Sequence, residues 1–477
     1  MRLVRFLPFL LAACGSSSTP SPDSGIDPTQ QTTWYQDVGP IVATHCTSCH
    51  KDGGIAPFSL TSYDDAAPIA NHLLDQINAG AMPPFDAREE ADCTPRFGWK
   101  DDPRLSADDI ATITKWIADG TPAGQMADLP APASTDLPGV TQTLIPATPF
   151  TASGDQDQFM CTILDPKLAV GTWMTGLQVR PGNPNVVHHV VLSEMQPGTD
   201  TDAAVAAHGV GLPFNCDQMA TPGFVMSIWT PGNQPLQTTD GELAVPLLAG
   251  SKVMMQIHYH PAGAINDPDA TAVDIRTSNT WPKKMYFVGA FGNAPAAPQL
   301  LPDPDDKTST PEFTIPANKA DHVEKMHFDV DLGDTKSVQV FSVNPHMHLI
   351  GTHINGTITR ATQTGNDPAT ECLANGNWNF DWQRTYIYDT TIDQLPTIHT
   401  GDAFDMECHW NNSVDNPFEQ RLLSDAGLGS PVDIHLGEQT TNEMCLEIFG
   451  LALDAPPPPA FAAGPTSLPK LPLFTRR

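Results

Sequence analysis

The stretch TGLQVRPGNPNVVHHVVL occupies residues 175–192, where a turn rich in Pro, Gly and Asn separates two short apolar runs. A run of the same kind recurs as KVMMQIHYH at residues 252–260. Short runs rich in β-branched residues between Pro and Gly turns predict β-strands. A linker at residues 294–310 divides the region that holds them, so we predict two all-β, β-sandwich domains at residues 141–293 and 311–454.

The region before these strands has helical periodicity. In LSADDIATITKWIADGTP, Ser106 can cap a helix, Asp109 can complete the capping box and Gly120 can end the helix. We therefore predict a small all-α domain at residues 31–122, followed by a linker at residues 123–140.

The first residues, MRLVRFLPFLLAAC (1–14), predict a bacterial lipoprotein signal, because a short apolar run follows two arginines and ends at Cys14. Cys14 would carry the lipid and residues 15–30 would form a disordered tether, whereas a chance apolar start would leave Cys14 unmodified. No apolar run reaches the ~18 residues of a membrane span, so membrane association would come from the lipid anchor only. We expect an exported protein on the periplasmic or extracellular face of a bacterial membrane, the outer one, with a Pro-rich tail at residues 455–477.

The charge of the chain is strongly negative. Lys plus Arg number 24 against 55 for Asp plus Glu, which gives a net charge of -31. Such a field repels phosphate backbones and excludes nucleic acid as a partner. The nine cysteines of an exported chain can form disulfides or hold cofactors.

The string HCTSCHKDGG predicts a covalent haem c, because Cys46 and Cys49 can add to the haem vinyl groups and His50 can bind the iron. The alternatives are a disulfide between the two cysteines or half of a zinc site. Met82, on a loop stiffened by proline, is the candidate for the second axial position.

The residues alone leave two competitors for that second axial position, His45 and His72. The stretch from HCTSCHKDGG through MPPF to the final helix resembles class I cytochrome c domains. That resemblance favours Met82 over both histidines.

The predicted strands carry several side chains that can bind a metal. They are His188, His189, His258, His260, His346, His348 and Met444. Residues i and i+2 of a strand share a face, so each His-x-His can present two imidazoles to one ion. Imidazole suits zinc or copper, and a thioether favours copper. Adjacent histidines point to opposite faces, so His188 and His189 can share an ion only at a bulge, and otherwise one is a core and one a surface residue.

Four motifs, VVHHVVL, MQIHYH, PHMHLIG and TTNEMCLEIFG, follow one another in this order within about residues 145–452. The order resembles the copper type II ascorbate-dependent monooxygenases, the family of peptidylglycine alpha-hydroxylating monooxygenase and dopamine beta-monooxygenase. The resemblance implies two jelly-roll domains that face each other across a cleft, with two copper ions. Copper A would be held by His188, His189 and His258, and the catalytic copper B by His346, His348 and Met444. His260 would then not be a ligand, and Met347 would be a core residue.

The resemblance also implies two disulfides, one between Cys161 and Cys216 and one between Cys408 and Cys445. The sequence leaves open whether the remaining Cys93 and Cys372 pair with each other or stay free.

Two positions depart from the enzymes that amidate peptides. Asn344 stands where those enzymes have an arginine that binds the substrate carboxylate, and Ile448 stands where they have a tyrosine. Peptide amidation is therefore not expected.

The resemblance implies a copper-dependent monooxygenase that uses O2 to hydroxylate a C–H bond of a small-molecule or peptide-like substrate. An external donor, ascorbate-like or a periplasmic redox protein, would supply electrons, and the fused haem offers a route to copper A. The main alternative is a non-enzymatic extracytoplasmic electron-transfer or copper-handling protein. A scaffold that only binds zinc conflicts with Met444 as a ligand and with the haem.

Overall fold

The computed structural model describes residues 31–52, 54, 56–131, 134–154, 157–216, 224–260, 267–294, 299–457 and 465. The predicted signal with Cys14, the tether and most of the Pro-rich tail lie outside these described residues. Within the described part of the chain, no helix has both the length and the apolar character needed to cross a membrane.

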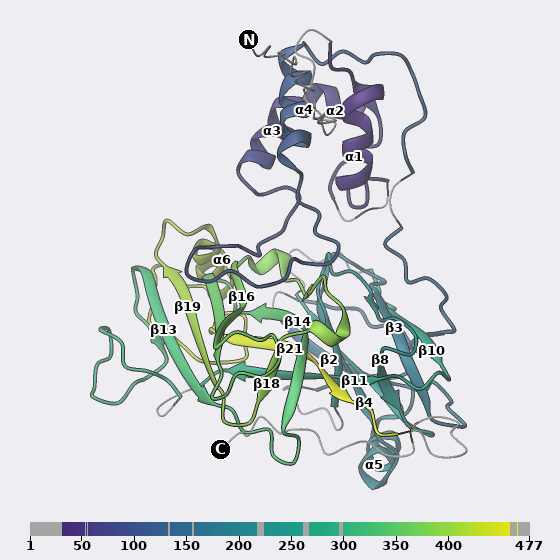
Figure 1. Ribbon diagram of the computed structural model, residues 1–477, viewed down its shortest axis with the longest axis vertical. Helices are drawn as coiled ribbons and strands as arrows, with labels where there is room; N and C mark the ends of the chain where they lie inside the picture. Colours follow the sequence, from purple (N-terminus) through teal and green to yellow (C-terminus); the bar gives the residue numbers. More distant parts are fainter. Residues whose placement is uncertain are drawn as a thin grey trace, which may run out of the picture.

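Short helices occupy the first part of the described chain and gather at one end of the molecule (Figure 1). Their bounds are η1 Trp34–Val38, α1 Gly39–His45, α2 Tyr63–Ala66, η2 Ala67–Ile69, α3 Ala70–Asn78 and α4 Ala107–Ala118. The capping box expected at Ser106 and Asp109 is present at the start of α4. An apolar cluster that includes Trp34 and Trp116 packs these helices together, apart from the main core.

The prediction of a separate all-α domain at residues 31–122 is wrong. Strands make up 35% of the structure and helices 16%, and the longest helix of this region, α4, has only 12 residues. Residues 83–104, which we call the strap, form no helix and lie on the β-strands instead. The physical reason is burial: Phe85 and Trp99 of the strap belong to the main hydrophobic core rather than to the core of the helices.

The remaining elements are almost all strands. The first half contains β1 Gln142–Leu144, β2 Gln158–Leu164, β3 Thr172–Arg180, β4 Val187–Met195, α5 Thr199–His208, β5 Pro213–Asn215, β6 Phe224–Trp229, β7 Leu236–Gln237, β8 Leu243–Leu247, β9 Lys252–Tyr259, β10 Ala272–Ser278 and β11 Lys284–Gly292. The second half contains β12 Thr314–Ile315, β13 Lys319–Asp329, β14 Ser337–His346, β15 Gly351–Thr359, β16 Thr370–Asn377, η3 Phe380–Trp382, β17 Tyr386–Ile387, η4 Ile392–Gln394, β18 Thr397–His399, β19 Ala403–Asn412, α6 Pro417–Ala426, β20 Ile434–His435 and β21 Leu446–Asp454.

One sheet runs through both halves. Its main path is β1-β10-β3-β8-β11-β21-β14-β17, so strands from residues 141–293 and 311–454 hydrogen-bond within a single ten-stranded sheet. The junction is the antiparallel pair β11 and β21, which runs from Lys284 opposite Asp454 to Gly292 opposite Leu446. Pairing these strands satisfies backbone groups that two separate sandwiches would expose at their edges. The predicted fold class, an all-α domain followed by two separate β-sandwich domains, is therefore wrong as a whole.

Three smaller sheets accompany the large one in the described structure, and the smallest is the pair β12-β20. The sheet β5-β2-β9-β4-β6 belongs to the first half, and the sheet β13-β19-β15-β16 belongs to the second. One continuous apolar core contains residues from both halves, such as Val190 and Phe404. His188 and His189 lie on β4 and His258 lies on β9, both in the sheet β5-β2-β9-β4-β6. His346 ends β14, His348 follows that strand, and Met444 precedes β21.

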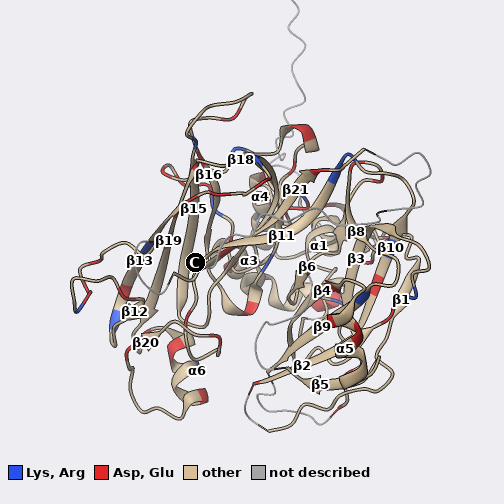
Figure 2. Ribbon diagram, turned by 90° about the horizontal axis from the view of Figure 1, so that it is seen from below, with Lys and Arg blue, Asp and Glu red and all other residues tan. Residues whose placement is uncertain are grey.

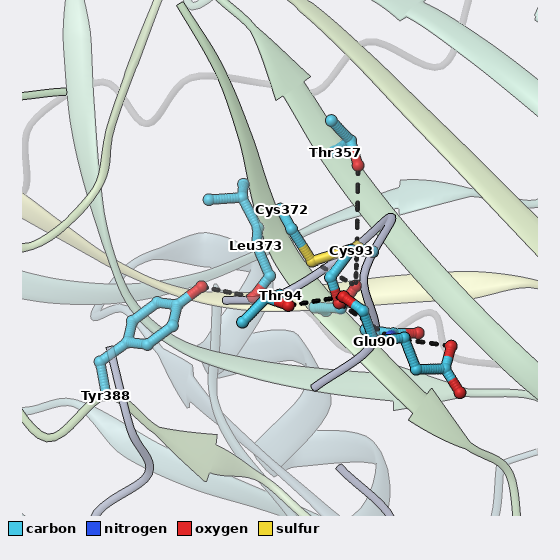
Figure 3. Close-up of a disulfide and its surroundings, with 9 residues drawn as sticks. Glu90, Cys93, Thr94, Thr357, Cys372, Leu373 and Tyr388 are labelled. Carbon is cyan, nitrogen blue, oxygen red and sulfur yellow. Dashed lines mark hydrogen bonds between the residues drawn. A yellow bond between two sulfur atoms is a disulfide. The ribbon is translucent and has the colours of Figure 1, made fainter. Parts of the chain in front are cut away.

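Three disulfides join distant parts of the chain. Cys161 pairs with Cys216 and Cys408 with Cys445, the two pairs that the family resemblance implies. Cys93 and Cys372, which the sequence left open, also form a disulfide, with an S–S distance of 2.13 Å. It links the strap to β16 (Figure 3). Three disulfides are compatible with an exported protein.

Candidate metal centres

The first candidate site lies where β4 and β9 pair. His189 is the direct cross-strand neighbour of His258, and the register shifts between Val187 and His189. His188 is therefore the extra residue of a β-bulge. Sequence analysis predicted that His188 and His189 can face one ion only at a bulge, and the structure has a bulge at this position.

The three imidazoles converge through the same ring atom. The Nδ1 atom of His189 lies 3.1 Å from Nδ1 of His188 and 3.3 Å from Nδ1 of His258. Three nitrogens bound tetrahedrally at about 2.0 Å from one ion are about 3.3 Å apart, so the spacing fits a metal ion. Burial lowers the pKa of His188 and of His189 well below its usual value. Both rings are thus neutral, as metal ligands must be.

A carboxylate that the sequence did not single out lies behind this site. Asp157 Oδ2 is 3.2 Å from His258 Nε2, and its Oδ1 is 2.7 Å from His260 Nδ1. Burial alone would raise the pKa of Asp157, but the contacts with the two histidines lower it below its usual range. A carboxylate behind a ligating imidazole fixes the ring and its tautomer. His260 contacts Asp157 through Nδ1, and its Nε2 atom is buried without a hydrogen-bond partner in the described structure, so the expectation that His260 is not a ligand stays a prediction. Asp157 belongs to no motif, so only the folded chain reveals it.

The second candidate site lies at the end of β14. His346 is opposite Leu446 of β21, and Met444 precedes this strand by two residues. The His346 Nδ1 atom lies 3.1 Å from Gln383 Oε1, and the His348 Nδ1 atom lies 3.1 Å from the Asn442 carbonyl oxygen. With each Nδ1 proton donated to an oxygen, both Nε2 atoms are left to bind a metal.

The electrostatics of this second pair also suit metal binding. Burial lowers the pKa of His346 to about 4 and that of His348 to about 3, so both rings are neutral at pH 7. Their ring centroids are 5.4 Å apart. Met347, between them, is fully buried in the core, as expected.

Glu443 ties Met444 to the His-Met-His segment. Its carboxylate accepts hydrogen bonds from the backbone N–H groups of His348 at 2.9 Å, Ile350 at 2.8 Å and Met444 at 3.2 Å. The indole of Trp410 donates a further one at 3.0 Å. Burial raises the pKa of Glu443 to about 7. No local pattern singles out this glutamate, because its partners come from three separate segments.

A short segment connects the two sites. Phe380 in η3 stacks on His188 with ring centroids 4.6 Å apart, and Gln383 Nε2 donates to the Phe380 carbonyl oxygen at 3.2 Å. Gln383 also holds His346 through its Oε1 atom. A cavity of about 170 Å³ lies beside His188 and is lined by Phe380, Gln383 and Arg421 among others. Charge on His346 would lower the pKa of His188, so the two sites are electrostatically coupled.

The Cys46–His50 segment follows α1. Cys46 and Cys49 are both free thiols, so the structure does not contain the alternative disulfide. Burial raises the pKa of Cys46 to about 12. His50 is buried, and its Nδ1 atom lies 3.1 Å from the Phe58 carbonyl oxygen. Two free thiols beside an imidazole with an available Nε2 fit covalent haem attachment.

The three candidates for the second axial position have different surroundings. His45 Nδ1 lies 2.9 Å from the Pro103 carbonyl oxygen, and His72 is exposed on α3. Met82 is half-buried on the loop after α3, where its backbone N–H donates to the Gln76 carbonyl oxygen at 3.2 Å. No hydrogen bond of the Met82 side chain is found within the described residues. Its role as axial ligand stays a prediction.

Another group of possible ligands is formed by Asp303, Asp305 and His322, which no motif indicated. Lys319 Nζ lies 2.9 Å from Asp305, and His322 contacts Asp305 and Glu324 at 3.2 and 3.0 Å. Lys319 already balances part of the negative charge, so we assign no metal to this group.

Comparisons with known proteins do not assign a family. No family model matches the sequence, and no curated protein matches it. Similar solved structures include the major capsid protein P2 from bacteriophage PM2, at 11% identity and a TM-score of 0.21 over 65% of this chain and 97% of that chain. Allantoicase is similar at 10% identity and a TM-score of 0.16, over 55% of this chain and 79% of that chain. The CBM22-1-CBM22-2 tandem domain of Paenibacillus barcinonensis Xyn10C is similar at 10% identity and a TM-score of 0.15, over 63% of this chain and 79% of that chain. TM-scores this low carry no argument about fold or function. The structure itself defines a mostly β, disulfide-linked chain with histidine groups that can hold metal ions.

Proposed function

We propose that this protein is a copper-dependent monooxygenase that hydroxylates a C–H bond of a substrate with O2. The observation that carries the proposal is the contrast between two histidine sets. His188, His189 and His258 converge through Nδ1, whereas His346 and His348 keep both Nε2 atoms free. Two separate mononuclear sites with different ligands agree with the family that the motif order resembles.

The residues of each set have distinct tasks in this proposal. His188, His189 and His258 would hold copper A, and His346, His348 and Met444 would hold copper B. When bound, the two copper ions would supply one-electron storage and the activation of O2. Gln383 and Glu443 hold the second set in place through hydrogen bonds to the His346 ring and to the His348 backbone.

The haem belongs to the same proposal. Cys46 and Cys49 would hold it covalently, His50 and Met82 would be the axial ligands, and an external donor, ascorbate-like or a periplasmic redox protein, would reduce it. The free thiols and the oriented His50 ring support the attachment. A haem c with a thioether ligand favours electron transfer over oxygen binding.

The proposed location follows from the predicted signal. The three disulfides agree with export, and lipidation at Cys14 would anchor the protein to a bacterial membrane, the outer one. Acidic residues are spread over both halves of the β region (Figure 2), so we expect the lipid, and not a basic surface, to hold the protein at an anionic membrane.

The test is to measure metal and haem content of the purified full chain and then O2 consumption with candidate substrates. About two copper ions and one haem per chain, with product formed in step with O2, would support the proposal. Loaded copper without substrate-dependent O2 consumption would instead indicate an electron-transfer or copper-handling protein. Zinc in both histidine sites would contradict both functions.

A further inference from the structure

A second cavity, of about 90 Å³, is lined by Asn344, which lies two residues before His346 on β14. Asn344 and Ile448, which are direct neighbours across β14 and β21, line it. Because side chains two residues apart share a strand face, Asn344 and His346 point to the same side of the sheet. The cavity is therefore on the same face of β14 as a proposed copper ligand, and one of its lining residues is two positions away from that ligand.

The strap supplies one wall of this cavity. Phe85, Lys100 and Asp101 of the strap line it, together with Arg384 and Tyr386 from the second half. The Lys100 backbone N–H donates to the Ile387 carbonyl oxygen at 2.8 Å, which holds the strap beside β17.

The Cys93–Cys372 disulfide fixes the same strap to β16 (Figure 3). Trp99 adds a bridge to Tyr388 with stacked rings 5.0 Å apart. A disulfide and a stacked pair of aromatic rings thus hold the strap in place beside the cavity.

The cavity carries positive charge in a strongly acidic protein. In the described part of the chain, Arg384 donates to the backbone carbonyl oxygens of Pro84 and Gly232, at 3.4 and 3.2 Å, and its charge also acts to lower the pKa of Asp86, which burial raises. Neither Arg384 nor Lys100 forms an ion pair within the described part of the chain, whereas the chain as a whole has 55 acidic and 24 basic residues. Asp101 also lines the cavity, so two cations face one carboxylate there.

We propose that this cavity binds the substrate, and that the substrate is a small organic carboxylate with an apolar body. The carboxylate would lie against Arg384 and Lys100, and the apolar body along Tyr386 and Ile448. A water molecule needs roughly 10 to 15 Å³ by the same measure, so the cavity has room for a molecule of several heavy atoms. The role as substrate site rests on the proposed function, whereas the anion site itself does not.

The experiment is calorimetric titration of the full chain with benzoate, compared with benzyl alcohol and benzylamine. Benzoate should bind at least about tenfold more tightly than either, because a charge-assisted hydrogen bond to Arg384 has no counterpart in them. Arg384→Gln and Lys100→Gln should each weaken benzoate binding about tenfold or more. Lys336→Gln, an exposed charge that does not line the cavity, should leave it unchanged.

The outcomes separate this inference from the proposed function. Lys100 is exposed, so its variant tests the cavity even if Arg384→Gln does not fold. Equal binding of benzoate to wild type and Lys100→Gln, or tighter binding of benzylamine, would overturn the carboxylate site while copper content stays as it was. If benzoate binds as expected but neither histidine set loads copper, the anion site stands and its role as a substrate site is wrong.

Discussion

His258 and His260 are two residues apart, yet the structure gives them different partners. His258 Nδ1 faces the other two imidazoles, whereas His260 Nδ1 contacts Asp157. Their spacing alone suggested that both could bind one ion. The bulge at His188 brings His188 and His189 to the same side as His258, whereas the Nδ1 atom of His260 faces Asp157.

We predict that His258→Ala lowers the copper content of the purified chain from about two ions to about one, because copper A loses a ligand that holds it. His260→Ala is the matched control and should keep about two. Metal analysis and the Cu(II) paramagnetic resonance spectrum measure both. Equal copper loss in the two variants would mean that the ligand assignment is wrong.

Glu419 is a buried carboxylate whose ionisation should affect the stability of the fold. It lies on α6 with no exposed surface, and neither carboxylate oxygen has a hydrogen-bond partner in the described structure. Burial raises its pKa from the usual 4.5 to about 7. A pKa above that of the unfolded chain means that the protonated form stabilises the fold. This contribution is complete below pH 4.5 and is lost as the pH rises through about 7.

We therefore expect Glu419→Gln to unfold at a higher temperature than wild type at pH 8 and at a similar temperature at pH 4.5. The difference in the free energy of unfolding at pH 8 should be on the order of 2 to 3 kcal/mol. Glu438→Gln, an exposed glutamate, is the control and should change neither value. Calorimetric melts at the two pH values measure the effect, and a pH-independent difference would argue against it.

At the scale of elements, the strap is the segment whose structure differs most from the sequence-based expectation. The sequence predicted it as part of an all-α domain, but its backbone pairs with the second half instead. Arg88 N–H donates to the Asn375 carbonyl oxygen at 2.9 Å, and Ala87 is bridged to Gly376. Phe85 and Trp99 bury their rings against Tyr386.

We predict that Cys93→Ala with Cys372→Ala lowers the free energy of unfolding by about 2 to 5 kcal/mol, because the unfolded chain loses a constraint between segments distant in sequence. The copper content should stay at that of wild type, because neither cysteine contacts a proposed ligand. Each single variant should lose nearly as much stability as the double variant, since both remove the same bond. Urea unfolding provides the measurement, and additive losses would show that the cysteines act separately.

At the scale of the whole molecule, the helices at one end have an apolar cluster of their own, whereas both halves of the β region share a single core and a single ten-stranded sheet. The proposed haem segment and the proposed copper ligands thus lie in different parts of the packing. Loss of one cofactor need not disturb the other.

We expect the Cys46→Ala and Cys49→Ala double variant to lack covalent haem, because no thioether bond can form, while copper binding continues. Haem staining after denaturing electrophoresis and metal analysis measure the two outcomes. Copper lost together with haem would show that the helical region and the β region depend on each other. The single variants should retain some haem through the remaining thiol.

The capping box at Ser106 could be predicted from the sequence because it depends on a short spacing, and the structure contains it. The CxxCH string and the two His-x-His motifs also depend on short spacings, and their metal chemistry stays a prediction. Pairing of Cys161 with Cys216 and of Cys408 with Cys445 came from the order of motifs and agrees with the structure.

Only the tertiary structure decided the features that depend on contacts between distant segments. The shared sheet arises because β11 pairs with β21, and no local pattern specifies which edge strand a strand will join. The residues that contact the candidate metal ligands, Asp157, Gln383 and Glu443, lie far in sequence from those histidines. Local propensity and spacing determine what a segment can do, whereas burial and long-range pairing determine where it lies and what it contacts.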